Sequence, residues 1–160
     1  MTITSLTSLY QSGTITLTRT FQNETIEVVF NCQDAADPAA QREDDEDEPN
    51  ENDEEGIHFK IIISKPDSDK MILDCSAFDQ VMIDAVRYVP PGKSVTDDTL
   101  YDGPTFDHLD SELQAAFYSY LSDRQIDDDL ATFIVNYSRE KEQNEYAYWL
   151  RQLAFFAAEK

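Results

Sequence analysis

Carboxylates are the residues of this chain with the greatest capacity for chemistry. The 160 residues include 33 aspartates and glutamates against 12 lysines and arginines, which gives a formal net charge of −21. Twelve of these acids lie between Gln33 and Gly56, where the one basic residue is Arg42. Carboxylates can pair for acid–base catalysis, hold a divalent cation, or attract basic proteins through their summed charge. The residues around them decide among these uses.

Catalytic or metal-binding use of the carboxylates finds little support in their spacing. Asp74 could join a second carboxylate in acid–base work, but with 33 acids in the chain such pairs are expected by chance. Residues 51–56 imitate the first half of a calcium-binding loop, yet Ile62 occupies the position that needs a bidentate glutamate. For the acidic run, the sequence is compatible with weak and unselective binding of divalent cations.

Other reactive residue types are sparse. His58 and His108 are fifty residues apart and have no paired metal-ligand spacing. Cys32 and Cys75 both fall in expected strands, which favours buried thiols over a redox pair. Residues 92–94 resemble the end of a phosphate-binding loop, but the glycine required five residues earlier is missing. We therefore expect no catalytic residue, no cofactor and no metal site.

The acidic segment, residues 33–56, is expected to be a disordered loop. It has no aromatic or β-branched residue, so it cannot bury enough apolar surface to offset the entropy lost on ordering. Its uninterrupted acidic run supplies the candidate contacts for basic partners, namely Glu43, Asp44, Asp45, Glu46, Asp47 and Glu48. A solvating insertion without a binding role is the alternative interpretation.

Apolar and polar residues alternate on both sides of this segment, as they do in half-buried strands. The expected strands cover residues 14–21, 25–30, 57–63, 71–75 and 81–89, and an extended piece at 100–107 is a candidate last strand. Short polar turns separate the strands, so the pattern predicts a meandering antiparallel sheet.

The period changes from two to 3.6 at Asp110, which is a good N-cap residue. One apolar stripe follows from Leu113 to Leu121, and a second runs from Ile126 to Tyr137. The polar stretch 138–145 then predicts a kink, or a point at which the helix leaves the sheet. Beyond it lie the candidate subunit contacts, which are Tyr146, Trp149, Leu150, Leu153 and Phe156. Strands first and helices last predict an α+β fold.

Length and composition limit the class of protein. The chain fits one domain, residues 1–160, which is large enough to bury a core without disulfides. The net charge of −21 disfavours direct binding of nucleic acids or anionic membranes and favours Lys/Arg-rich proteins as partners. We find no apolar run long enough to span a membrane, and the first thirty residues resemble neither a signal peptide nor a transit peptide.

The order of these features resembles the mitochondrial glycoprotein family of acidic proteins. The resemblance rests on a threonine-rich hairpin, the acidic insertion, the strand Met71-Ile72-Leu73-Asp74-Cys75 and two C-terminal motifs. Residues 121–131 are similar to the family's "L-x-x-R-G-[IV]-[DN]" junction, and residues 145–153 to its "E-Y-x-x-[FW]-L-x-x-L" final helix. Gln125 stands where the family has glycine, so we expect another backbone conformation at that turn.

The resemblance implies a strongly twisted antiparallel sheet of about seven strands flanked by helices, with three subunits closing into a doughnut-shaped homotrimer. It also implies a non-enzymatic, chaperone-like protein of the mitochondrial matrix that binds many ligands and supports mitochondrial translation and oxidative phosphorylation. Family members usually begin with a transit peptide and an N-terminal helix, so this chain is expected to be a trimmed or partial form.

Two other classes of function stay open at this point. A carboxylate-dependent hydrolase would need two carboxylates about 5–9 Å apart in a pocket. A nucleic-acid-mimicking regulator would present rows of carboxylates in place of phosphates, and DNA or RNA would displace its partners. Composition and resemblance together favour the acidic binding protein.

Overall fold

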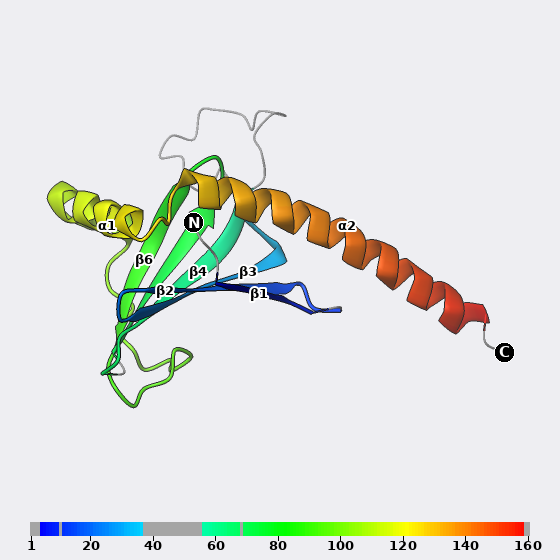
Figure 1. Ribbon diagram of the computed structural model, residues 1–160, viewed down its shortest axis with the longest axis horizontal. Coiled ribbons are helices and arrows are strands. Elements are labelled where there is room, and N and C mark those ends of the chain that lie inside the picture. Colours follow the sequence, from blue (N-terminus) through cyan, green and yellow to red (C-terminus); the bar gives the residue numbers. More distant parts are fainter. Residues whose placement is uncertain (1–3, 10, 37–55, 68, 159–160) are drawn as a thin grey trace.

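The computed structural model describes residues 4–9, 11–36, 56–67 and 69–158 (Figure 1). It contains a single antiparallel sheet followed by helices. The elements are β1 (Ser5–Ser8), β2 (Thr14–Phe21), β3 (Glu24–Ala36), β4 (Gly56–Ser64), β5 (Lys70–Ala77), β6 (Val81–Val89), the 3-10 helix η2 (Phe106–His108), α1 (Ser111–Asp123) and α2 (Asp128–Ala158). The expected α+β fold is confirmed.

The strands pair in chain order, β1-β2-β3-β4-β5-β6, and every pair is antiparallel. The meander is therefore as predicted, but the described residues hold six strands rather than about seven. The candidate strand at 100–107 is wrong. Phe106 is buried there in the turn η2, where its ring meets Phe117 and Tyr118 edge to face at 5.9 and 5.7 Å.

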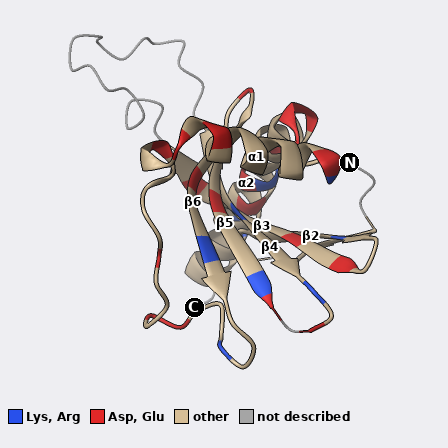
Figure 2. Cartoon of the chain, turned by 90° about the vertical axis from the view of Figure 1, so that its left-hand side faces the viewer, with Lys and Arg blue, Asp and Glu red and all other residues tan. Residues whose placement is uncertain are grey.

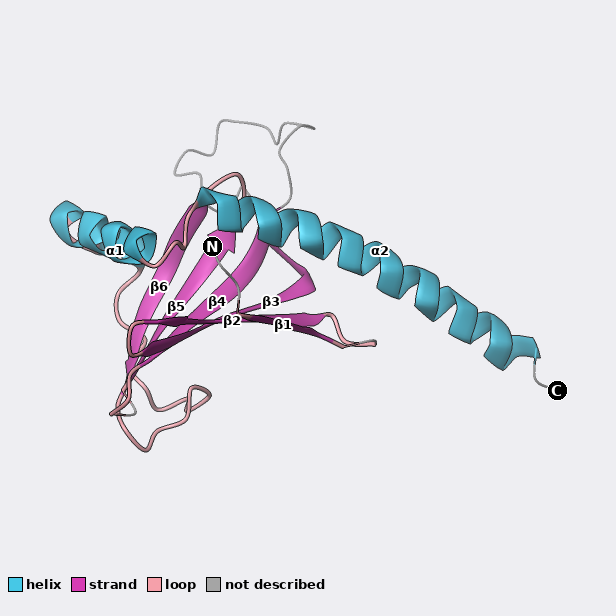
Figure 3. Cartoon of the chain, in the orientation of Figure 1, coloured by secondary structure: helices cyan, strands magenta, loops and turns pink. Residues whose placement is uncertain are grey.

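The core lies on the face of the sheet that the helices cover (Figure 3). The strand register stacks apolar residues across it: Ile61 lies between Val28 and Leu73, and all three side chains are fully buried. Burying side chains of this size stabilises the fold by about 1.5–3 kcal/mol each. From α2, Leu130 and Ile134 complete this core.

Helix α2 is continuous over its 31 residues, so the polar stretch 138–145 does not break it. The last buried residue of the helix is Ser138. Beyond that point the helix leaves the core face of the sheet, contacts the β1–β2 connection and ends away from the body of the protein (Figure 1). Of the two outcomes expected at this stretch, departure from the sheet is the one that occurs.

The turn between α1 and α2 corrects the expectation for Gln125. This residue has φ of 57°, the left-handed conformation in which glycine is usual. The Ile126 N–H donates to the Leu121 carbonyl at 3.0 Å, and the Gln125 N–H donates to the Ser122 carbonyl at 2.8 Å. Leu121 and Ile126 are also both buried. These are the bonds and the apolar contact of a Schellman cap, which forms here around glutamine.

Replacing Gln125 by glycine is therefore expected to stabilise the protein by about 0.5–1 kcal/mol, because a side chain in the left-handed region is strained. Chemical denaturation of the two proteins, compared at the same concentration, measures the difference. Gln125→Ala is the control and should give no gain, since alanine keeps the strained Cβ. Equal effects of glycine and alanine would contradict this account of the turn.

Candidate functional site

The acidic segment leaves the sheet between β3 and β4. Ala35 pairs with Ile57 and Ala36 with Gly56, so residues 33–36, expected as loop, belong to β3. A Cβ on Gly56 would approach the Phe78 ring to 2.4 Å, so the return of the chain to the sheet requires glycine. The predicted contacts Glu43–Glu48 lie outside the described residues.

Further acidic residues lie on the elements around this point. Asp79 is in the β5–β6 turn, at the same end of the sheet as Ala36 and Gly56, and Asp128 and Asp129 occupy the first turn of α2. Figure 2 shows acidic residues gathered where the helices meet the sheet, whereas the basic residues of β5 and β6 lie toward the opposite end. The charge of the folded part is therefore unevenly distributed.

The face of the sheet opposite the helices is shaped by two irregularities in the strand pairing. Between β3 and β4 the register shifts from Phe30 to Ala35, and between β5 and β6 it shifts after Asp74. The second shift leaves Asp84 as an extra residue of β6, because Asp74 pairs with Ala85 and Cys75 with Ile83. Bulges of this kind redirect side chains. Here they border a hollow of about 360 Å³.

A chain of polar side chains crosses three strands beside this hollow. The Ser76 hydroxyl donates to Asp84 Oδ2 at 2.8 Å, and its oxygen lies 3.0 Å from His58 Nδ1. The donor and acceptor in the contact between Ser76 and His58 are set by the tautomer of the imidazole. Burial raises the pKa of the Asp84 carboxyl above its ordinary value, and the hydrogen bond from Ser76 opposes that rise.

These three residue types are those of a nucleophilic triad, but their order differs. In a triad the imidazole lies between serine and carboxylate and removes the serine proton. Here the serine lies between the other two, it donates to the carboxylate, and it is fully buried. The geometry therefore fits a structural connection that holds the β6 bulge against β5 and β4.

Asp74, the candidate for acid–base work, is engaged in ion pairs on the same face. Its two carboxylate oxygens lie 3.4 Å from Lys60 Nζ and 2.8 Å from an Arg87 nitrogen. Arg87 also reaches Asp102 of the following loop at 3.5 Å. This carboxylate therefore joins β4, β5 and β6 electrostatically.

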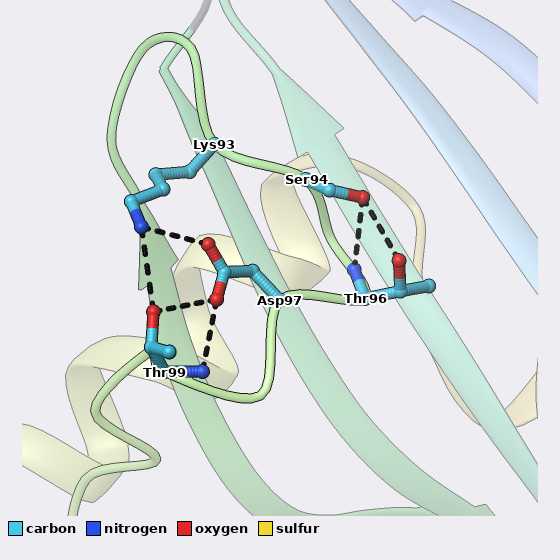
Figure 4. A network of polar contacts seen from close by, with 5 residues as sticks. All are labelled: Lys93, Ser94, Thr96, Asp97 and Thr99. Atoms are coloured by element: carbon cyan, nitrogen blue, oxygen red, sulfur yellow. Dashed lines mark hydrogen bonds and ion pairs between the residues drawn. The ribbon is translucent and has the colours of Figure 1, made fainter.

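The loop that contains residues 92–94 forms its own network (Figure 4). The Lys93 ammonium donates to Asp97 at 2.8 Å and to Thr99 at 3.3 Å, and the Ser94 oxygen accepts from the Thr96 N–H at 3.2 Å. The bonds from Lys93 and Thr99 hold the pKa of the Asp97 carboxyl well below its ordinary value. The Lys93 ammonium is thus engaged within the loop itself.

Both cysteines are free and buried, as the sequence predicts. Burial raises the pKa of the Cys75 thiol well above its ordinary value, and that of Cys32 to a smaller degree. The thiolate is the reactive form, so these shifts make both residues less reactive at neutral pH. Within the described ranges, no three His, Cys, Asp or Glu residues form a group that could hold a metal ion, and no helix is long and apolar enough to cross a membrane.

The predicted subunit contacts lie on the part of α2 that leaves the sheet. In the single chain they form an exposed apolar stripe, with Tyr146 54%, Trp149 53%, Leu150 44%, Leu153 45% and Phe156 80% exposed. The same part of the helix is held to the β1–β2 connection, because the Gln11 N–H donates to Glu145 at 3.0 Å and the Lys141 ammonium donates to the Leu9 carbonyl at 2.8 Å.

Together these features define an α+β protein with a twisted antiparallel sheet, helices on one face and a large excess of acidic residues. A family model described as mitochondrial glycoprotein matches residues 8–157. The chain belongs to this family, which confirms the resemblance seen in the sequence.

Relatives and solved structures agree with this assignment. The chain is 36% identical over 106 residues to the mitochondrial acidic protein mam33 of Schizosaccharomyces pombe, over 60% of this chain and 39% of that protein. It is 32% identical over 144 residues to an uncharacterized mitochondrial protein of Arabidopsis thaliana, over 89% of this chain and 57% of the relative. Both relatives are named as mitochondrial, in agreement with the expected localisation, and the chain spans about two fifths to three fifths of their length.

Two trypanosomatid proteins share the fold. One is a Leishmania major protein of unknown function, described as a sequence homologue of human p32, and the other is the Trypanosoma brucei p22 protein. Each superposes with a TM-score of 0.77 at 22% identity over 96% of this chain, and the match covers 82% and 81% of their chains.

Proposed function

We propose that this chain is a non-enzymatic, chaperone-like binding protein of the mitochondrial matrix that holds Lys/Arg-rich proteins through its acidic residues. The observation that carries the proposal is the distribution of charge. Twelve acids and one arginine fall within residues 33–56, and the segment joins the fold beside further aspartates of the β5–β6 turn and α2. Such a field attracts cationic proteins and is screened over about 8 Å at physiological salt.

The mode of binding follows from the strength of exposed ion pairs. Each one contributes only about 0–1 kcal/mol, so useful affinity requires many at once. An extended basic segment satisfies this requirement better than a compact neutral surface. Ribosomal proteins and unassembled basic subunits have this chemistry, and holding them would support mitochondrial translation and oxidative phosphorylation.

Assembly into a homotrimer is part of the same proposal. The exposed stripe on the distal half of α2 supports it, because contiguous apolar surface of this kind marks interaction sites. Three copies around one axis would bring three acidic segments together and multiply the number of contacts available to one basic partner.

Replacing Glu43–Glu48 by serine and glutamine tests the binding mode. At low salt we expect affinity for two unrelated Lys/Arg-rich peptides to fall by about tenfold to a hundredfold, because six exposed charge pairs are lost. The salt dependence should become flatter for both peptides. Titration calorimetry at several salt concentrations measures both effects.

A matched control exchanges aspartate and glutamate at all six positions, which keeps the charge and changes the shape. It should bind as the unmodified chain does. Salt-independent affinity, or loss of only one of the two peptides, would instead favour a shaped pocket. Displacement of the peptides by RNA or DNA would favour the nucleic-acid-mimicking alternative.

A further inference from the structure

An apolar groove of about 390 Å³ lies between α1 and the end of the sheet opposite the acidic segment. The sheet contributes Ile63 at the end of β4, Met71 at the start of β5 and Tyr88 near the end of β6. The helix contributes Leu113, Ala116, Phe117 and Tyr120. Cavities of this volume with mostly apolar walls hold small ligands in many proteins.

Helix α1 is held beside the groove by polar contacts with the preceding segment, by the bond from the Ile83 N–H to the Tyr118 hydroxyl and by packing against the core. Near its start, the Gln114 side chain donates to the carbonyls of Phe106, Asp107 and Leu109 at 3.0–3.2 Å. Near its end, Leu121 is the one buried residue of the helix. The helical spacing places the four apolar groove residues of α1 along one side of the helix, where they line the cavity, and Leu113 remains 45% exposed. A bound apolar chain would remove this surface from water, which is favourable by about 25 cal/mol per Å².

The charges at this groove are unusual for so acidic a chain. Its lining includes two lysines, Lys65 and Lys70, and one acid, Asp69. The Asp69 carboxylate already accepts the Tyr88 hydroxyl at 3.1 Å, and this bond raises the pKa of Tyr88. Within the described part of the chain, no carboxylate forms an ion pair with Lys65 or Lys70. By contrast, the hollow beside the distal half of α2 is lined by Glu142 and Glu145 and by no lysine or arginine.

From this combination we infer that the groove binds an acyl carboxylate of medium chain length. The chain would lie against Met71, Leu113 and Phe117, and the carboxylate would meet the ammonium groups of Lys65 and Lys70. Ammonium groups on flexible stems act as point charges that follow a mobile head group. The site is separate from the acidic segment, and its ligand has the opposite charge to the basic partners proposed above.

Calorimetric titration of the full chain with dodecanoate tests this inference, below the concentration at which the amphiphile aggregates. We expect one dodecanoate per chain and at least tenfold weaker binding of dodecyltrimethylammonium, which has the same chain and a cationic head. Lys65→Gln with Lys70→Gln should weaken dodecanoate binding about tenfold, because two partly exposed charge pairs are lost. The matched control, Lys60→Gln with Lys93→Gln, makes the same charge change outside the groove and should bind as before.

A variant that fills the groove separates the apolar contribution from the charge. Ala116→Trp should abolish binding while circular dichroism shows the fold intact, and Leu113→Gln, which makes the exposed wall polar, should weaken binding if the tryptophan variant does not fold. Equal binding of dodecanol and dodecanoate would indicate a purely apolar groove suited to a protein segment. That result, or equal losses in the two lysine pairs, would overturn the inference without affecting the proposed role of the acidic segment.

Discussion

Replacing Arg124 by methionine is expected to lower the free energy of unfolding by about 3–5 kcal/mol. The Arg124 side chain forms a buried ion pair with Glu24, in which Nε and a terminal nitrogen each lie 2.8 Å from the same carboxylate oxygen. The guanidinium also lies over the Tyr120 ring, 3.4 Å from its centroid, and donates to the Tyr120 carbonyl at 2.9 Å. Without it, a carboxylate on a residue only 6% exposed would lose its charged partner.

Urea unfolding at fixed protein concentration measures this loss of stability. Two further variants serve as controls. Lys93→Met removes a cation from an exposed pair with Asp97 and should leave the unfolding midpoint almost unchanged. Changing Glu24 and Arg124 together to glutamine and methionine should restore part of the lost stability, because no unpaired charge is then buried. If Arg124→Met proved as mild as Lys93→Met, the ion pair would contribute little and packing would have to anchor the end of α1.

The ion pair between Glu24 and Arg124 is a feature that the sequence does not predict. Glu24 is 100 residues away from Arg124, and no periodicity relates the two, so the pair follows from the tertiary fold alone. The alternation of apolar residues, in contrast, is local and indicates the strands from β2 to β6, while the change of period at Asp110 indicates the α1 cap. Asp110 accepts the Glu112 N–H at 2.9 Å, as its position before the helix predicts.

The errors in the predicted fold have the same origin, because tertiary contacts and not local sequence patterns decide these elements. Strand β1 is four residues long and holds one apolar residue, so it gives no measurable period, and its pairing with β2 forms the strand. The piece at 100–107 has strand-like residues, but Phe106 packs against α1 instead. Gln125 adopts the left-handed conformation because the buried contact of Leu121 with the following turn outweighs the strain of one side chain.

The surface features could be predicted only in part. The composition of the acidic segment and the apolar stripe of α2 can both be recognised in the sequence. The sequence therefore predicts both candidate partner surfaces. The polar chain of His58, Ser76 and Asp84 depends on a one-residue shift in the pairing of β5 and β6, which no spacing along the chain reveals. The groove beside α1 likewise depends on how far the helix stands from the sheet.

The largest expected change in assembly comes from Trp149→Asp combined with Leu153→Asp. Each copy carries a net charge of −21, so association must overcome repulsion, and burial of apolar surface is the force that can do so. Both side chains are about half exposed in the single chain and lie on one stripe of α2. We expect the unmodified chain to sediment as a trimer at micromolar concentration and the double variant to sediment as a monomer.

The control for this prediction places the same two charges on the other side of the helix. Asn144→Asp with Ala158→Asp adds two carboxylates at exposed positions away from the stripe and should leave the trimer intact. Trp149 is the one tryptophan of the chain, so Leu153→Asp alone also supplies an optical test. In this variant the fluorescence emission of Trp149 should shift to longer wavelength, because the indole becomes exposed to water. A double variant that still sediments as a trimer would show that the subunits associate through another surface.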